Sequence, residues 1–126
     1  MALDRGSISN VVRVSAASTV AIATCSSSKK VYIKSIAVHA AGSGINTGTG
    51  QVYVVPNGEA VTDVTDGSYS HIIFNVDVTA GETVLLEPAY PIVLDTTGDK
   101  LFVGTGNYSG LAATHMNFYI TGDQEA

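Results

Sequence analysis

The sequence predicts an all-β protein: a single-domain, jelly-roll-like antiparallel β-sandwich of eight or nine short strands. Val (16), Thr (13) and Ile (9) make up nearly a third of the 126 residues, while Leu numbers only 6. β-Branched side chains suit pleated sheets and are poor helix formers. Thirteen Gly stand in short clusters that supply turns. Turn signals recur every 8–12 residues or so, which is typical of a sandwich or barrel.

The first part of the chain divides into a polar lead-in and two short strands. Residues 1–10 lack an apolar pattern and predict a flexible N-terminal arm, so that the sandwich domain spans residues 11–122. Strands are expected at Val11–Ser15 and Thr19–Thr24. In the second of these, Val20 and Ile22 share one face and leave alanines on the other. Such an alanine face suits close packing against a neighbour.

The longest expected strand, Val31–His39, changes the phase of its alternation midway. Val31 and Ile33 share one face, whereas Ile36 and Val38 have the other parity. The polar pair Lys34–Ser35 stands at the change. A β-bulge at this pair would return all four apolar side chains to the core, because one extra residue restores the period of two.

Two prolines mark a special segment in the second half of the chain. Pro88 and Pro91 have no backbone N–H to donate to a ladder, so Ala89–Leu94 is expected at a sheet edge or at a crossing between sheets. Regular strands are expected before this segment in the chain, at residues 51–56, 71–78 and 83–87, and after it, at residues 101–104.

The last strand alternates without interruption from His115 to Thr121. Its inner face is predicted to be Met116, Phe118 and Ile120, and its outer face His115, Asn117, Tyr119 and Thr121. Gly122 is expected to end it, leaving residues 123–126 as an acidic C-terminal tail. A strand this late must pair with an early one, which favours a jelly roll; an immunoglobulin-like sandwich is the alternative topology.

The chain carries few charges. Charged residues are 13% of the sequence, about half of the roughly 25% that soluble domains carry, and the net charge is −5. Part of this neutral surface is therefore expected to contact other subunits; a stable extracellular sandwich is the other interpretation. Acidity argues against nucleic-acid binding, since Lys29, Lys30 and Lys34 form the one basic spot. Neither an apolar run long enough for a membrane helix nor a secretory signal is expected.

No residue pattern indicates catalysis or a bound cofactor. The histidines His39, His71 and His115 are isolated, without the His-x-His spacing of a cupin metal site. Asp63–Gly67 resembles part of a calcium loop, but Phe74 stands where the twelfth position needs an acid. We therefore expect no catalytic, cofactor-binding or metal residues, no cofactor and no enzymatic activity. A metal-dependent, cupin-like enzyme is the alternative to this expectation.

Cysteine and tyrosine get structural interpretations. Cys25 is the one cysteine, so no intramolecular disulfide is expected. We expect it to be a small, half-buried side chain; an intersubunit bridge or a reactive thiol is the alternative. Carbohydrate platforms usually contain Trp, which is absent here. Most of the six tyrosines are therefore expected at the rim of the core, with the ring inside and the hydroxyl outside.

Two stretches carry a resemblance to a known class of protein. Val76–Pro88 and Pro91–Gly104 contain Ala-Gly-Glu-Thr, Pro-Ile and Gly-Asp turns at strand boundaries, followed by a glycine-rich loop and a last strand ending in Thr-Gly-Asp. This pattern resembles small β-sandwich structural proteins of tailed bacteriophages, of the capsid cement or decoration type. It extends over roughly residues 31–122 and is specific in residues 76–104.

The resemblance implies a function without chemistry. A cement protein is made in the host cytoplasm, is commonly a homotrimer, and binds the major capsid protein across subunit junctions on the outer capsid surface of the virion, away from DNA and membranes. The alternative is a β-sandwich module of a tail fibre, collar or baseplate that binds a receptor or a glycan. For the first hypothesis, residues 1–10 are a candidate docking segment.

Overall fold

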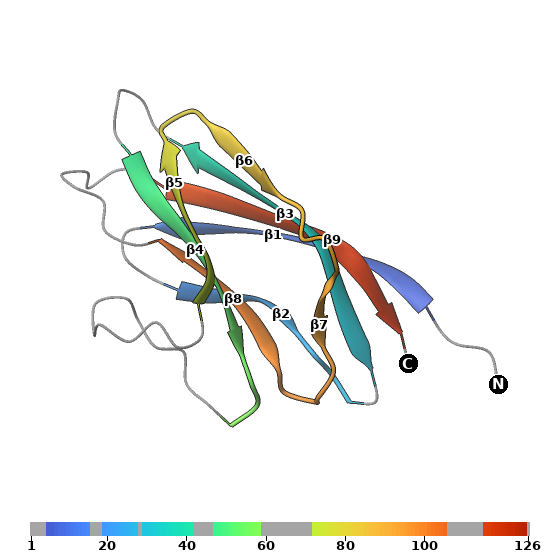
Figure 1. Cartoon of the computed structure of the whole chain (residues 1–126). Coiled ribbons are helices and arrows are strands. Elements are labelled where there is room, and N and C mark those ends of the chain that lie inside the picture. Colours follow the sequence, from blue (N-terminus) through green and yellow to red (C-terminus); the bar gives the residue numbers. More distant parts are fainter. Residues whose placement is uncertain are drawn as a thin grey trace.

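The computed structural model confirms the predicted fold class: it is an all-β sandwich of two antiparallel sheets (Figure 1). It describes residues 5–15, 19–27, 29–41, 47–58, 72–105 and 115–125. The five-stranded sheet has the order β1-β9-β3-β6, with β7 also paired to β3, and the four-stranded sheet has the order β2-β8-β4-β5. The strands of the first sheet are β1 (Arg5–Ser15), β9 (His115–Glu125), β3 (Lys30–Ala41), β6 (Thr83–Leu86) and β7 (Ile92–Leu94). Those of the second are β2 (Thr19–Thr24), β8 (Lys100–Thr105), β4 (Thr47–Val55) and β5 (Ile72–Thr79).

The connectivity is that of a jelly roll. In general, each strand is followed in the chain by a strand of the opposite sheet. The exceptions are β4 and β5, which lie in one sheet, and β6 and β7, which both pair with β3. Counting β6 and β7 as one interrupted strand leaves the eight strands of two Greek keys. The last strand lies between β1 and β3 and pairs with both (Figure 1). The predicted late closure by long-range pairing is therefore confirmed.

The predicted bulge in β3 is confirmed. The pairing of β3 with β9 shifts register between Ile33 and Ser35, so that Lys34 is the extra residue. Val31, Ile33, Ile36 and Val38 are consequently all buried. Without the extra residue, one of the two pairs would point away from the core.

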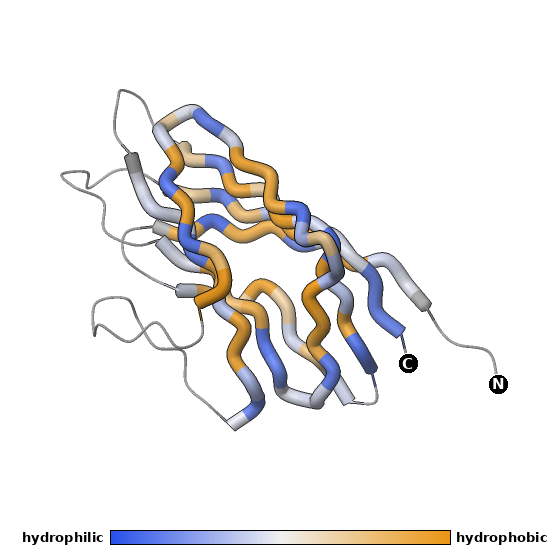
Figure 2. Tube along the Cα trace, viewed as in Figure 1, coloured by the Kyte–Doolittle hydropathy of each residue, from blue (hydrophilic) through white to orange (hydrophobic). Residues whose placement is uncertain are grey.

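One hydrophobic core fills the space between the sheets (Figure 2). The predicted inner face of the last strand belongs to it, since Met116, Phe118 and Ile120 are at most 1% exposed. The other buried members are Val14, Ile22, Cys25, Val31, Ile33, Ile36, Val38, Ala40, Val52, Val78, Leu94, Leu101 and Val103.

Both ends of the chain are more ordered than the sequence pattern indicates. Residues 5–10 lie in β1 and residues 123–125 lie in β9, where an arm and a tail are predicted. Residues 5–7 pair with residues 123–125, and residues 8–10 pair with residues 120–122. Gly122 does not end the strand. Residues 123–125 also pair with residues 30–32 of β3, so these segments form strands through pairing with neighbouring strands and without a long apolar alternation of their own.

The segment with the two prolines lies at an edge, as predicted. Strands β6 and β7 both pair with β3, and Pro88 and Pro91 stand between them. The predicted alanine face of β2 is wrong in part. A register shift between Ala21 and Ala23 turns Ala23 to the core, so that Ala21 and Ala23 do not share an outer face.

Candidate interaction surface

The candidate site is the outer face of the five-stranded sheet, which points away from the core. Since side chains alternate along a strand, the neighbours of the buried residues of β1, β9, β3 and β6 form this face. Cross-strand pairing places Val11 opposite Tyr119, Tyr119 opposite Ala37, and Ala37 opposite Leu85. These four residues, which we call the apolar row, cross four adjacent strands.

The apolar row is open to solvent. Val11 is 62% exposed, Leu85 58% and Tyr119 45%, and Ala37 is half-buried between its neighbours. Single exposed apolar side chains are normal on a protein surface, whereas contiguous ones mark interaction sites. Here three large side chains are aligned by the sheet register, so the row is a contiguous feature of the fold.

A row of polar side chains lies along one side of the apolar row. It consists of Arg13, Asn117, His39 and Thr83, which oppose one another in register. Arg13 Nε donates to Asn117 Oδ1 at 3.0 Å, and His39 Nδ1 lies 2.8 Å from Thr83 Oγ1. These bonds satisfy part of the polar capacity of the row, while the Arg13 guanidinium keeps its charge and further N–H donors for a partner or for solvent.

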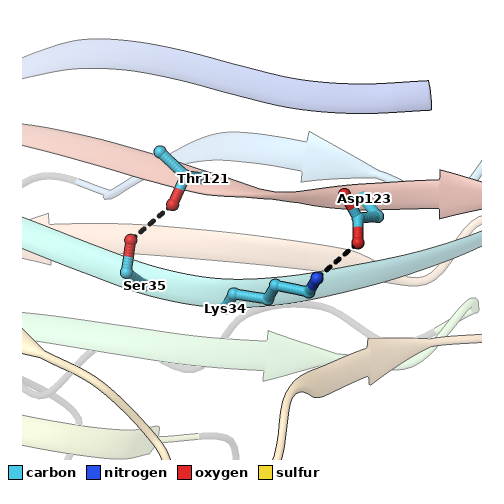
Figure 3. Close-up of polar contacts among 4 residues, drawn as sticks. All are labelled: Lys34, Ser35, Thr121 and Asp123. Carbon is cyan, nitrogen blue, oxygen red and sulfur yellow. Dashed lines mark hydrogen bonds and ion pairs between the residues drawn. The ribbon is translucent and has the colours of Figure 1, made fainter.

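The other side carries hydroxyls and paired charges. Ser35 Oγ and Thr121 Oγ1 are 2.5 Å apart, and Lys34 Nζ lies 2.5 Å from Asp123 Oδ2 (Figure 3). The Tyr32 hydroxyl donates to Glu125. The Lys34–Asp123 pair is exposed and contributes at most about 1 kcal/mol to stability. Its main effect is to leave little unpaired charge beside the apolar row.

The whole arrangement has the anatomy of a protein–protein contact: an apolar centre with one large aromatic, flanked by polar groups. Tyr119, which alternation placed on the outer face of the last strand, is at the centre of this surface. Sequence reasoning missed Val11 and Leu85 as its neighbours, because strand pairing alone brings them together. The available signal for their outward position was alternation, because Val11 and Leu85 have the parity opposite to the inward-facing Val14 and Leu86 of the same strands.

The histidines do not form a metal site in the part of the chain that the structure describes. His39 points outward and contacts Thr83, as expected from its parity. His71 and the side chain of His115 lie outside the described residues, as do Asp63 and Asp66. Among the residues described, no three His, Cys, Asp or Glu side chains are grouped to hold an ion.

The interpretation of the tyrosines is wrong for those the structure describes. Tyr32 and Tyr119 stand on the outer face of the sheet, and Tyr90 is 85% exposed. Tyr53 is fully buried, and its hydroxyl donates to Gln51 Oε1 at 2.8 Å instead of reaching solvent. Tyr69 and Tyr108 lie outside the described residues.

Cys25 is more deeply buried than predicted. It is 1% exposed, and Sγ donates to the carbonyl oxygen of Lys29 at 2.9 Å. Burial raises the pKa of the thiol, and the nearby Asp99 and Asp95 raise it further. Because the thiolate is the reactive form, this cysteine is an inert structural side chain.

A pocket of about 200 Å³ opens between the sheets where β1 and β2 lie at the sandwich edge. Ile8, Ile22 and Ile120 contribute apolar walls. Asn10 stands at it too, but its amide donates to Ile22 O at 2.9 Å and accepts from the Val11 N–H at 3.0 Å. Ligand pockets usually have about 300–1,000 Å³. This one is smaller, so its volume does not suit a sugar or a large cofactor.

Two comparisons with known proteins find no match: no protein-family model and no curated protein sequence matches the chain. Solved structures with some similarity include those of infectious bursal disease virus. The Gx strain structure has 16% sequence identity and a TM-score of 0.46, over 99% of this chain and 37% of that chain. The Gt strain structure has 13% identity and a TM-score of 0.39, over 98% and 31%. The chain thus spans about a third of the length of each, and similarity at this level carries no inference about function.

In the described ranges there is no helix of the length and hydropathy needed to cross a membrane.

Proposed function

We propose that the chain is a non-catalytic structural protein of a virion, of the capsid cement type, which acts by protein–protein adhesion. It is made in the host cytoplasm and binds the outer surface of the capsid as a homo-oligomer. The observation that carries the proposal is the apolar row, Val11–Tyr119–Ala37–Leu85, on a sheet face whose polar groups are largely paired among themselves. Such a face is built to be covered by protein.

The stretch that resembles cement proteins, which includes Leu85 of the apolar row, also supports the proposal. Its Ala-Gly-Glu-Thr segment forms the turn from β5 to β6, where the chain crosses between the sheets. Gly81 has a φ of 87°, and its N–H donates to Ala40 O at 2.7 Å. The shared residues are thus those that make this crossing, and they concern the scaffold and not a reactive site.

The mechanism requires buried area and no chemical step. A protein that contacts several capsid subunits at once gains avidity, because each further contact forms at a high effective concentration. The low charge of the chain, 13% of residues, limits the desolvation cost of covering its faces. The capsid is stabilised by the free energy of these contacts.

Co-sedimentation with empty capsids, assembled from the major capsid protein of the same genome, tests the proposal. We expect saturable binding at a fixed ratio to capsid subunits, and a higher temperature of capsid rupture in the bound state. Folded protein that stays in the supernatant at micromolar concentration would overturn it. Immunogold label on tails instead of heads would favour the fibre, collar or baseplate alternative.

A further inference from the structure

We propose that the apolar row is covered by a second copy of this chain, so that two five-stranded sheets pack face to face about a two-fold axis running along the row. This inference rests on the homo-oligomer of the proposed function: the apolar row joins the two copies, the capsid contacts fall to other faces of the dimer, and the test needs no capsid. It assigns to Val11, Tyr119, Ala37 and Leu85 the centre of a dimer interface, in place of the trimer that the resemblance implies.

The size of the face fits such a contact. Strands β1, β9 and β3, about 4.8 Å apart with 11 paired residues at about 3.3 Å per residue, cover roughly 14 by 36 Å, or about 500 Å², and the short strands β6 and β7 add about 100 Å². Stable interfaces bury about 800 Å² per partner. One copy of the face, with its projecting side chains, therefore supplies the area that a specific dimer needs.

The pattern of the face is self-complementary under this symmetry. A two-fold axis along the apolar row sets each of its residues against the same residue of the second copy, with Tyr119 near the centre. The same axis also sets the side chains on one side of the apolar row against those on the other side in the second copy. The row with Arg13 and His39 then faces the hydroxyl row of Ser9, Thr121 and Ser35. No like charges meet, whereas an axis along the strands would set the Arg13 row against itself.

Face-to-face packing also suits the local geometry. Sheets pack about 10 Å apart with strands within about 30° of parallel. The pairing of β1 with β9 has no register shift over its whole length, and the bulge of β3 lies at Lys34, outside the apolar row. The row is therefore carried by regular strands, as an interdigitating sheet contact requires.

Light scattering coupled to size exclusion measures the proposed state. We expect a species of about 26 kDa at micromolar concentration, twice the 13.0 kDa of the chain. Leu85→Arg places an unpaired charge in the apolar row and is expected to raise the dissociation constant at least about 100-fold, since central interface residues carry most of the binding energy. Tyr119→Ser should act in the same direction. Ile73→Arg is the matched control, because Ile73 is a 43% exposed aliphatic residue on the other sheet.

Cross-linking provides a second, independent readout. Ala37→Cys keeps a small side chain at the centre of the row, and a bismaleimide that reaches the about 10 Å between packed sheets should join two copies. The buried Cys25 stays unreactive, so the wild-type chain and the exposed control Thr97→Cys should give no covalent dimer.

Three results would overturn the inference: a folded wild-type monomer at micromolar concentration, a 39 kDa trimer that Leu85→Arg leaves intact, or a dimer that Leu85→Arg and Ile73→Arg weaken equally. Thermal melts of the monomeric variants confirm that they are folded. If the dimer forms but capsids do not bind it, the proposed function fails and the interface stands. If capsids bind a monomer, the interface fails and the function stands.

Discussion

Gly122→Ala is the most informative single substitution for the fold, because Gly122 lies where β9 passes the bulge of β3. It pairs with Ile8 on one side and Ile33 on the other, and it is buried. A Cβ built on it would lie well under 3.0 Å from the carbonyl oxygen of Tyr32, a separation that real Cβ atoms essentially never show, and 3.1 Å from the Ile33 Cα. Both atoms belong to the backbone, so no side-chain rotation relieves the clash.

The structure sets the magnitude. To accept the methyl group, β3 and β9 must separate locally by about 1 Å, and overpacking of this kind costs typically 1–3 kcal/mol or more. The same movement weakens neighbouring ladder bonds, each worth about 1 kcal/mol. We therefore expect a loss of about 3 kcal/mol in the free energy of unfolding and, at roughly 3–5 °C per kcal/mol for a chain of this size, a drop in Tm of about 10 °C or more.

Gly6→Ala is the matched control for this measurement. Gly6 lies in β1 opposite Gln124, which is two residues beyond Gly122 in β9. A Cβ built on Gly6 would stand in open space. It shares the entropic benefit of any Gly-to-Ala change, about 0.4–1 kcal/mol, without the clash. The midpoints of urea and thermal unfolding should therefore differ widely between the two variants. Equal midpoints for Gly122→Ala and Gly6→Ala would refute the close approach of β3 and β9.

Three further outcomes are expected. Phe118→Ala removes a fully buried ring from the centre of the core and should cost about 3–5 kcal/mol in chemical denaturation, against under about 1 kcal/mol for the exposed Lys34→Ala. Deleting Lys34 removes the bulge, so the side chains of β3 on one side of it exchange their inward and outward positions. Circular dichroism should therefore show no native fold. A deletion variant that folds would contradict the role of the bulge. Cys25 has a raised pKa in the folded state, so above about pH 8.5 the unfolded chain loses this proton first. Stability should therefore fall with rising pH up to the folded pKa, more steeply than in Cys25→Ala, and parallel pH profiles would contradict the burial of the thiol.

Much of the fold follows from local pattern. The alternation of Met116, Phe118 and Ile120, the change of phase at Lys34–Ser35 and the two prolines around Tyr90 each predicted what the structure contains: a core strand, a bulge and a sheet edge. These predictions succeed because the period of two and the missing proline N–H act within a few residues of one another.

Predictions that depended on a distant partner were wrong or incomplete. Residues 5–10 and 123–125 form strands because β9 pairs with both β1 and β3, and both segments are mostly polar when considered alone. Tyr53 is buried with a bonded hydroxyl, although its sequence context indicates a rim position. The partners of the two terminal segments lie far away in the chain. Tyr53, in contrast, bonds Gln51 on its own strand, and the burial of the two residues together depends on the tertiary structure.

By itself, the sequence determined the class of the protein: an all-β chain with few charges, a core built on alternating β-branched residues, and a last strand that must pair with an early one. The tertiary structure decided which residues share a surface. Val11, Ala37, Leu85 and Tyr119 lie on four strands, and register between strands alone aligns them into one apolar row. Alternation is a property of one strand, whereas a surface is a property of their pairing, and for that reason the candidate site emerges only in the folded sheet.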